Sequence, residues 1–213
     1  MSALSFYARV VRALDEIGAP YMIVGAFAGS AFGITRATYD IDILVDMREV
    51  HFQPLADRFP LPRYYADPEM MRNSTRMGIM FNLIDTEEGV KADLVPLKRE
   101  PEYRLAFERR IRRTFIDPSD VEMEAWCARP EDIIVGKFQA WKEGRSNKHP
   151  SDIFDIVVFL LSEENDLQYD LTIVSKAAAN LGTQVLELWS DIFDRAQSEV
   201  FSRNQNNIQD LSA

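Results

Sequence analysis

The chain has 213 residues, and 46% of them are hydrophobic, so it can bury a real core and is not a disordered protein. Its net charge of -10, from 34 acidic and 24 basic residues, disfavours non-specific binding to nucleic acids, which are polyanions. Cys127 is the single cysteine, which excludes an internal disulfide and a cysteine-rich zinc site. Because no apolar run approaches a membrane span of about 18 residues, a cytoplasmic protein is the simplest expectation.

The first half of the chain mixes helical and strand patterns. Apolar residues at helical spacing predict helices over Ser5–Ile17, Ala26–Phe32 and Val50–Phe59. Short apolar or alternating runs predict strands over Tyr21–Val24, Asp40–Val45, Gly78–Ile84, Val90–Val95 and Asp120–Trp126. The turn-like sequence DTEEG between two of these strands indicates a hairpin.

The second half of the chain shows only helical patterns. The expected helices are Ile133–Trp141, Ile153–Leu161, Leu171–Leu181 and Val185–Phe201, and the residues from Ser202 onward are expected to fray. The sequence therefore predicts an α/β domain of residues 1–128 followed by a C-terminal helical domain of residues 129–213.

Two acids interrupt an otherwise apolar strand. Residues two apart on a strand point to the same face about 6.6 Å apart, so Asp40 and Asp42 present two carboxylates side by side. Charge among apolar residues such as Ile41 and Ile43 is costly without a partner. Paired carboxylate oxygens suit Mg²⁺, which commonly bridges protein carboxylates and substrate phosphates.

A third acid, Asp93, lies on another predicted strand. If that strand neighbours the first in the sheet, Asp93 joins Asp40 and Asp42 around one or two divalent ions. Such ions stabilise the attacking and leaving oxygens of an in-line displacement at phosphorus, and one carboxylate can take the proton of an attacking hydroxyl. Phosphoryl or nucleotidyl transfer is the reaction that this pattern indicates.

Small residues lie between the two strands. Gly25, Ala26, Gly29 and Ser30 stand where a backbone can approach an anion closely. Small residues also let a helix pack closely on a sheet, and that is the commoner reason for them. Taken alone, they do not decide between the two explanations.

Together these motifs resemble the nucleotidyltransferase superfamily with the DNA polymerase β-like fold. Its signature is a hydrophobic residue, Gly, then Gly or Ser, a spacer, Asp-x-Asp and a later third carboxylate. Two registers fit it here, Val24-Gly25-Ala26 and Ala28-Gly29-Ser30, both ahead of Asp40-Ile41-Asp42. The wider pattern GAFAGSAFGITRATYDIDILV resembles the bacterial and archaeal subset that includes the AbiEii-type toxins of toxin–antitoxin pairs.

The resemblance implies an α+β fold, with a mixed β-sheet flanked by helices and followed by a C-terminal helical bundle. It also implies Mg²⁺ or Mn²⁺ as cofactor and ATP or another NTP as substrate. Asp40, Asp42 and Asp93 are then the catalytic residues and metal ligands. Nucleotide-binding residues by the same resemblance are Gly25, Gly29, Ser30, Arg36, Thr38 and Lys137.

Alternatives stay open at several of these residues. Arg36 before the strand also fits a salt bridge to the sheet, and Lys137 in PEDIIVGKFQAWKEGR also fits a solvated helix edge. The segment KHPSDIFDIVVFLL resembles a further family element, with Asp152 and Asp155, but Ser151 replaces its usual basic residue. The sequence also departs from the family where Ala26 follows Gly25 and where Phe32 replaces a frequent His.

Five arginines crowd the sequence YRLAFERRIRRTF between Arg104 and Arg113. They fit a surface that faces a phosphate backbone, or, somewhat better, a solvated helix end paired with Glu102 and Glu108.

The preferred hypothesis is a metal-dependent nucleotidyltransferase that moves NMP from an NTP to a hydroxyl of RNA, a protein or a small molecule. A cognate antitoxin is a candidate partner. A non-catalytic binding or regulatory module of the same fold is the alternative. A third hypothesis, an acyl- or sugar-modifying enzyme, lacks a suitable nucleophile and base.

Overall fold

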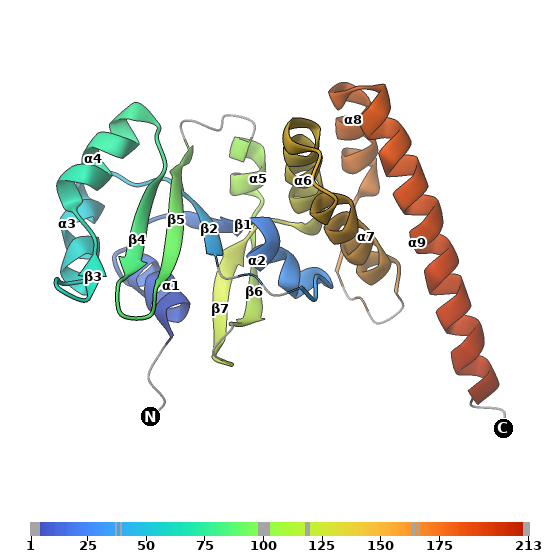
Figure 1. Cartoon of the computed structure of the whole chain (residues 1–213), viewed down its shortest axis with the longest axis horizontal. Coiled ribbons are helices and arrows are strands. Elements are labelled where there is room, and N and C mark those ends of the chain that lie inside the picture. Colours follow the sequence, from blue (N-terminus) through green and yellow to red (C-terminus); the bar gives the residue numbers. More distant parts are fainter. Residues whose placement is uncertain are drawn as a thin grey trace. The chain divides into compact units, whose positions relative to one another are not determined.

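The computed structural model describes residues 5–36, 38, 40–97, 103–117, 120–162, 165 and 167–210, with only the backbone of 206–210. The chain divides into two compact units (Figure 1). The sheet unit contains Met1–Ala31 and Arg36–Arg129, and the helical unit contains Phe32–Thr35 and Pro130–Ala213.

In the described part of the chain, the sheet has seven strands in the order β3-β4-β5-β2-β1-β7-β6. Their bounds are β1 Tyr21–Val24, β2 Asp40–Val45, β3 Tyr64–Tyr65, β4 Phe81–Asp85, β5 Val90–Pro96, β6 Ile111–Ile116 and β7 Glu122–Cys127. Two pairs, β2 with β5 and β1 with β7, are parallel, and the others are antiparallel. The predicted hairpin is β4 and β5, and the predicted mixed α+β class is confirmed.

Helices cover the sheet within this unit. They are α1 Phe6–Glu16, α2 Gly25–Gly29, α3 Glu49–Arg58, α4 Pro68–Met77 and α5 Arg104–Glu108. The 3₁₀ turn η1 Ser30–Phe32 continues α2, and its last residue belongs to the helical unit. The central strands are apolar on one face, where Ile41, Ile43, Ala92 and Leu94 are fully buried. Because successive side chains alternate between faces, the acids of β2 and β5 all belong to the other face.

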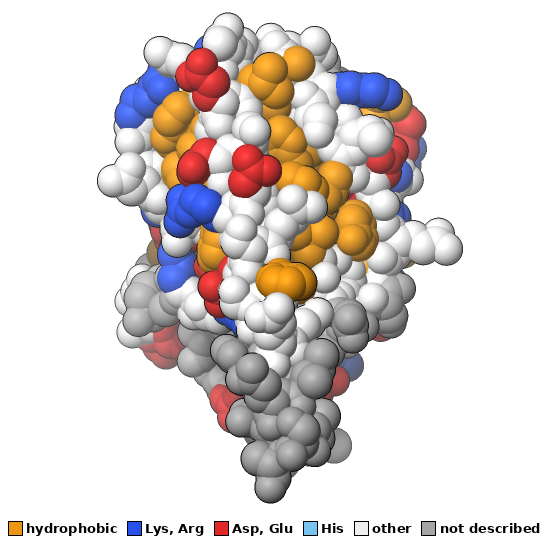
Figure 2. Space-filling model, turned by 90° about the vertical axis from the view of Figure 1, so that its right-hand side faces the viewer, with side chains coloured by type: hydrophobic (Ala, Val, Ile, Leu, Met, Phe, Trp, Pro, Cys, Tyr) orange, Lys and Arg blue, Asp and Glu red, His pale blue; other side chains and the backbone are white. Residues whose placement is uncertain are grey.

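The helical unit consists of α6 Pro130–Gly144, α7 Lys148–Leu161, α8 Leu171–Leu181 and α9 Thr183–Asp210. Its core includes an edge-to-face contact between Phe138 and Trp189, whose ring centroids are 6.1 Å apart. Figure 2 shows apolar side chains gathered between charged ones on one face of this unit. On α8 and α9, an open groove of about 400 Å³ is lined by Leu171, Trp189 and Phe193 among others.

Several elements differ from the sequence prediction. Between Pro60 and Gly78, where none was predicted, lie β3 and α4; Asp67 caps α4 and Gly78, with positive φ, ends it. The predicted fraying tail is wrong, because α9 continues through Asp210. A side-chain hydrogen bond one turn apart, from Arg203 to Glu199, lies at the start of that extension.

The arginine cluster is not simply a helix end. Only Arg104 lies in α5, whereas Arg112 and Arg113 lie in the edge strand β6. The carboxylates beside Arg112 are those of Asp15 and Glu124, on α1 and β7. The predicted partner Glu102 lies outside the described residues.

Cys127 is fully buried at the end of β7, and burial raises the pKa of its thiol to about 12. The thiol is then almost wholly protonated at pH 8, and the thiolate is the reactive species. We expect Cys127 to resist an aromatic disulfide reagent in the native protein and to react fully in denaturant. The absorbance of the thiolate that the reagent releases measures the reaction. Rapid labelling of the native protein would contradict this placement.

Within the described residues, α9 and the other helices are all too short or too polar to cross a membrane.

Candidate functional site

A row of polar side chains crosses the sheet at one level. Asn82 on β4 is the register partner of Asp93 on β5, Asp93 is the partner of Asp42 on β2, and Asp42 is the partner of Val24 on β1. Register partners on neighbouring strands point to the same face of a sheet. The strand of Asp93 is thus the neighbour of the Asp40–Asp42 strand, which is the arrangement that a shared site needs.

Asp40 lies one row away from Asp42 on the same face, and its register partner is Lys91 on β5. The Lys91 ammonium lies 2.7 Å from Asp93 Oδ2 and 4.0 Å from Asp40 Oδ1. One lysine therefore stands between two of the three predicted acids.

Asp93 is the most deeply placed of the three acids, at 7% exposure. Its carboxylate accepts hydrogen bonds from Lys91 Nζ and from the Asn82 side-chain amide. The same hydrogen bond to Asp93 raises the pKa of Lys91 above its usual range, against the effect of desolvation. The buried charge of Asp93 is thus compensated by the protein itself.

The donor set suits a hard divalent cation in chemistry and in strand position, since three carboxylates of adjacent strands share one face. Their side chains are not gathered for one: across the described ranges, no three acid, histidine or cysteine side chains lie close enough to hold a metal ion. Lys91 lies among them, in contact with Asp93 and 4.0 Å from Asp40. In ligand chemistry, three carboxylates fit Mg²⁺ or Mn²⁺.

Gly25 lies where β1 ends and α2 begins, directly against Asp42. Its φ is +71°, and a Cβ placed on it would lie 2.5 Å from Asp42 Oδ2. A side chain at residue 25 would therefore collide with the carboxylate and strain the backbone. Of the two sequence registers, Val24-Gly25-Ala26 is the one at the strand end beside the acids.

Gly29 and Ser30 lie at the far end of α2. Gly29 is buried, and the Ser30 hydroxyl donates to the Phe27 carbonyl oxygen at 2.7 Å. Ahead of β2, Arg36 is exposed and the Thr38 hydroxyl donates to the Asp40 carbonyl oxygen at 3.3 Å. The nucleotide-binding roles of these four residues stay predictions.

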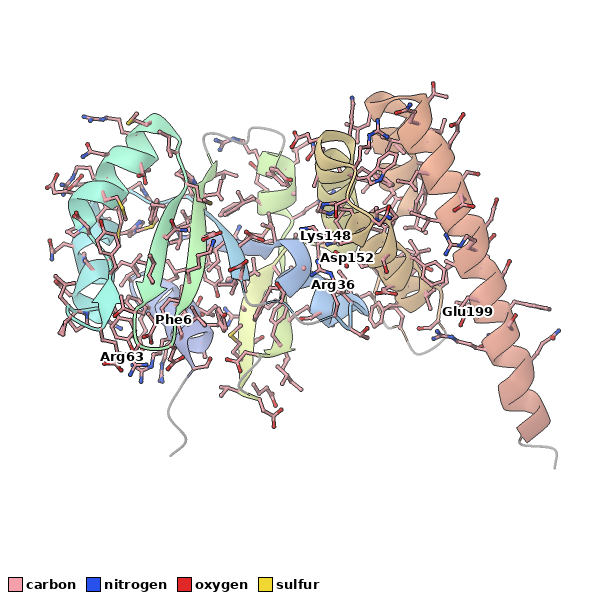
Figure 3. The ribbon with its side chains drawn as sticks, viewed as in Figure 1. Phe6, Arg36, Arg63, Lys148, Asp152 and Glu199 are labelled. Atoms are coloured by element: carbon pink, nitrogen blue, oxygen red, sulfur yellow. The ribbon has the colours of Figure 1, made fainter. Side chains whose placement is uncertain are left out.

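Lys137 belongs to the helical unit, where it forms a buried ion pair. Its Nζ lies 2.6 Å from Asp152 Oδ2, and the two side chains are 6% and 1% exposed. Asp152 is labelled on α7 in Figure 3. Burial, together with the charge of Asp152, raises the pKa of Asp155 one turn further on. The predicted contact of Lys137 with a nucleotide phosphate stays a prediction.

Phe32 is a core residue of the helical unit. It is fully buried, and its ring meets that of Phe159 edge-on at 6.2 Å. The neighbouring Gly33, with φ +92°, lies so close to α7 that a Cβ on it would be 2.9 Å from the Asp155 carbonyl oxygen. Phe32 therefore has a packing role here.

Sequence reasoning missed Lys91 and Asn82. The signal for Lys91 was its position two residues before Asp93, which on a strand means the same face. The signal for Asn82 required the hairpin register, which the sequence alone leaves open.

Comparison with known proteins gives structural neighbours only. An antigenic nucleotidyltransferase-like protein from Paracoccidioides brasiliensis is 19% identical, with 89% of this chain and 94% of that one aligned at a TM-score of 0.48. The antibiotic-resistance factor ANT(2″)-Ia, in complex with adenylyl-2″-tobramycin, is 16% identical. The alignment covers 90% of this chain and 94% of that one, with a TM-score of 0.41. A CCA-adding enzyme in complex with ATP is 15% identical, with 82% of this chain and 42% of that one aligned at a TM-score of 0.34. No family model and no curated protein matches the chain.

The contact between Gly25 and Asp42 can be tested against a matched glycine. Gly18 has φ +66°, and a Cβ placed on it would meet no atom within 4 Å, so Gly18→Ala carries the backbone strain alone, about 1 kcal/mol. We expect Gly25→Ala to lower the free energy of unfolding by at least about 1 kcal/mol more, because it adds the collision. Urea unfolding measures both, and equal losses would contradict the contact.

The Lys137–Asp152 pair is expected to be a strong determinant of stability. Removing one partner leaves a buried charge, so Lys137→Met should cost roughly 3 to 5 kcal/mol of unfolding free energy. The double variant Lys137→Met/Asp152→Leu should cost less than the two single losses together.

Lys142→Met is the control, since Lys142 is exposed on the same helix and should cost only about 0.5 kcal/mol. Urea unfolding of Lys137→Met, Asp152→Leu, the double variant and Lys142→Met measures the coupling. If Lys137→Met is as mild as Lys142→Met, the pair does not stabilise the helical unit.

Proposed function

We propose that the protein is a metal-dependent nucleotidyltransferase that transfers NMP from an NTP to a hydroxyl acceptor. The observation that supports it most is the alignment of Asp42 and Asp93 on adjacent parallel strands, with Asp40 on the same face and Gly25 against Asp42. Acids placed together in a sheet are costly unless they serve a cation or a reaction.

Asp40 and Asp42 are the residues to hold Mg²⁺ or Mn²⁺, with Asp93 as a third ligand or as general base. Bound there, the metal would neutralise charge on the phosphates and on the leaving group. The acceptor oxygen bonds to the α-phosphorus, the bond from that phosphorus to the bridging oxygen of the β-phosphate breaks, and pyrophosphate leaves. The hydroxyl proton passes to a carboxylate of the site.

Gly25 lets the end of β1 lie directly against the Asp42 carboxylate, where a side chain would collide. A phosphate beside the acids needs such an approach of backbone. In this proposal Gly29, Ser30, Arg36, Thr38 and Lys137 assist nucleotide binding, as the sequence resemblance implies. The toxin–antitoxin association, a cytoplasmic location and the division into domains at residues 128 and 129 are further proposals from the sequence.

The non-catalytic module is the second candidate, and the Lys91–Asp93 ion pair favours it. A carboxylate that is held by an ammonium group and by Asn82 needs no metal to be stable. If the charge of Asp93 were neutralised permanently in this way, the protein would keep the fold but would not catalyse the reaction. Two other features weigh against this module. Asp93 does share the face of Asp42. A cleft blocked by Phe32 would favour the module, but Phe32 is a core residue.

Calorimetry with non-hydrolysable NTP analogues distinguishes the two candidates. With Mg²⁺, we expect the protein to bind at least one analogue, and Asp40→Asn/Asp42→Asn to lose at least about 10-fold in affinity, because the metal loses its ligands.

Asp57→Asn is the matched control, because Asp57 is an exposed acid on α3 that accepts only from Gln53 among the contacts described. It should bind as the wild type does. Absence of binding to every analogue, with and without Mg²⁺, would leave the non-catalytic module as the better account.

A further inference from the structure

The acidic face already contains a cation of its own. Lys91 Nζ contacts both oxygens of Asp93, at 2.7 and 3.0 Å, and lies 4.0 Å from Asp40. Two of the three carboxylates that would serve a divalent ion are therefore next to a positive charge that the chain supplies.

We propose that Lys91 is a built-in counter-ion that competes with the metal for these carboxylates, so that tight metal binding needs a nucleotide whose phosphates draw Lys91 away. The inference rests on the proposed function and adds an order to it: the metal and the triphosphate bind together. Metal alone binds weakly.

The two partners of the ion pair differ in freedom. The Asp93 side chain is 10% exposed, whereas that of Lys91 is 43% exposed. A lysine is a strongly hydrated point charge on a flexible stem, so it can leave a carboxylate for a phosphate without a rearrangement of the sheet. Asp93 is then released from its ammonium partner, which a general base or a metal ligand requires.

Asn82 keeps the site intact while Lys91 moves. Its side-chain amide donates to Asp93 Oδ1 from the neighbouring strand β4. One polar partner therefore remains on the carboxylate when the ammonium leaves, and the buried oxygen is not stripped of hydrogen bonds. Asp93 can therefore exchange Lys91 for a metal ion while it keeps its hydrogen bond to Asn82.

The size of the competition follows from charge separation. An ammonium and a divalent ion that share carboxylates lie within a few ångströms of each other, and their repulsion at a partly exposed site changes affinity by about 10-fold or more. Distant surface charges are screened at physiological ionic strength and change it by less than about twofold.

The test is Mn²⁺ binding by the full chain, followed by the electron paramagnetic resonance signal of free Mn²⁺. Without nucleotide, Lys91→Met should bind Mn²⁺ about 10-fold more tightly than the wild type. Lys91→Arg retains the charge and should stay near the wild type. Lys176→Met makes the same substitution at an exposed residue of the helical unit and should also change little.

A non-hydrolysable ATP analogue should tighten Mn²⁺ binding more in the wild type than in Lys91→Met, because only the wild type has an ammonium to displace. Should Lys91→Met fail to fold, Lys91→Gln removes the charge and can still hydrogen-bond to Asp93. It should show the same tightening.

The outcomes separate this inference from the proposed function. Equal Mn²⁺ affinity in the wild type and Lys91→Met, with analogue-dependent binding that Asp42→Asn abolishes, overturns the counter-ion role and leaves the transferase standing. If neither protein binds Mn²⁺, with or without the analogue, both proposals are overturned.

Discussion

Repulsion between like charges on one face of β2 and β5 is the constraint that the sheet unit must satisfy. The opposite face of these strands is fully buried, so a register shift of one residue would move Ile41 and Ile43 out of the core and carry the acids into it. Hydrophobic burial thus holds Asp40, Asp42 and Asp93 together against their repulsion. Lys91 and Asn82 reduce that repulsion locally, and a metal would reduce it further.

The strands that carry the acids were predictable because their pattern is local. The bounds of β1 and β2 match the prediction, and the β4–β5 hairpin follows from its turn sequence. The pairing of β2 with β5 was not predictable, because two parallel strands are joined through a long crossover that leaves no mark in the sequence. The proximity of Lys91 to Asp40 depends on that same pairing.

Other elements were missed because their composition misled. The strand β6 reads IRRTFI, and its arginines resemble a charged helix end, although Phe115 packs inward beside Phe27 with ring centroids 5.6 Å apart. In the helical unit, the ion pair of Lys137 with Asp152 was also not predicted, because a single sequence does not reveal that a residue 15 positions on is the partner. Motif position and packing contact are separate kinds of information.

The segment Phe32–Thr35 belongs to the helical unit, although the sheet unit lies on both sides of it in the sequence. The polypeptide therefore passes from one unit to the other after residues 31, 35 and 129. A fragment that begins at Pro130 would lack Phe32 and leave the ring of Phe159 without its neighbour. The two units are consequently not separable modules in the genetic sense: neither recombination nor limited proteolysis at one peptide bond yields both with their cores complete.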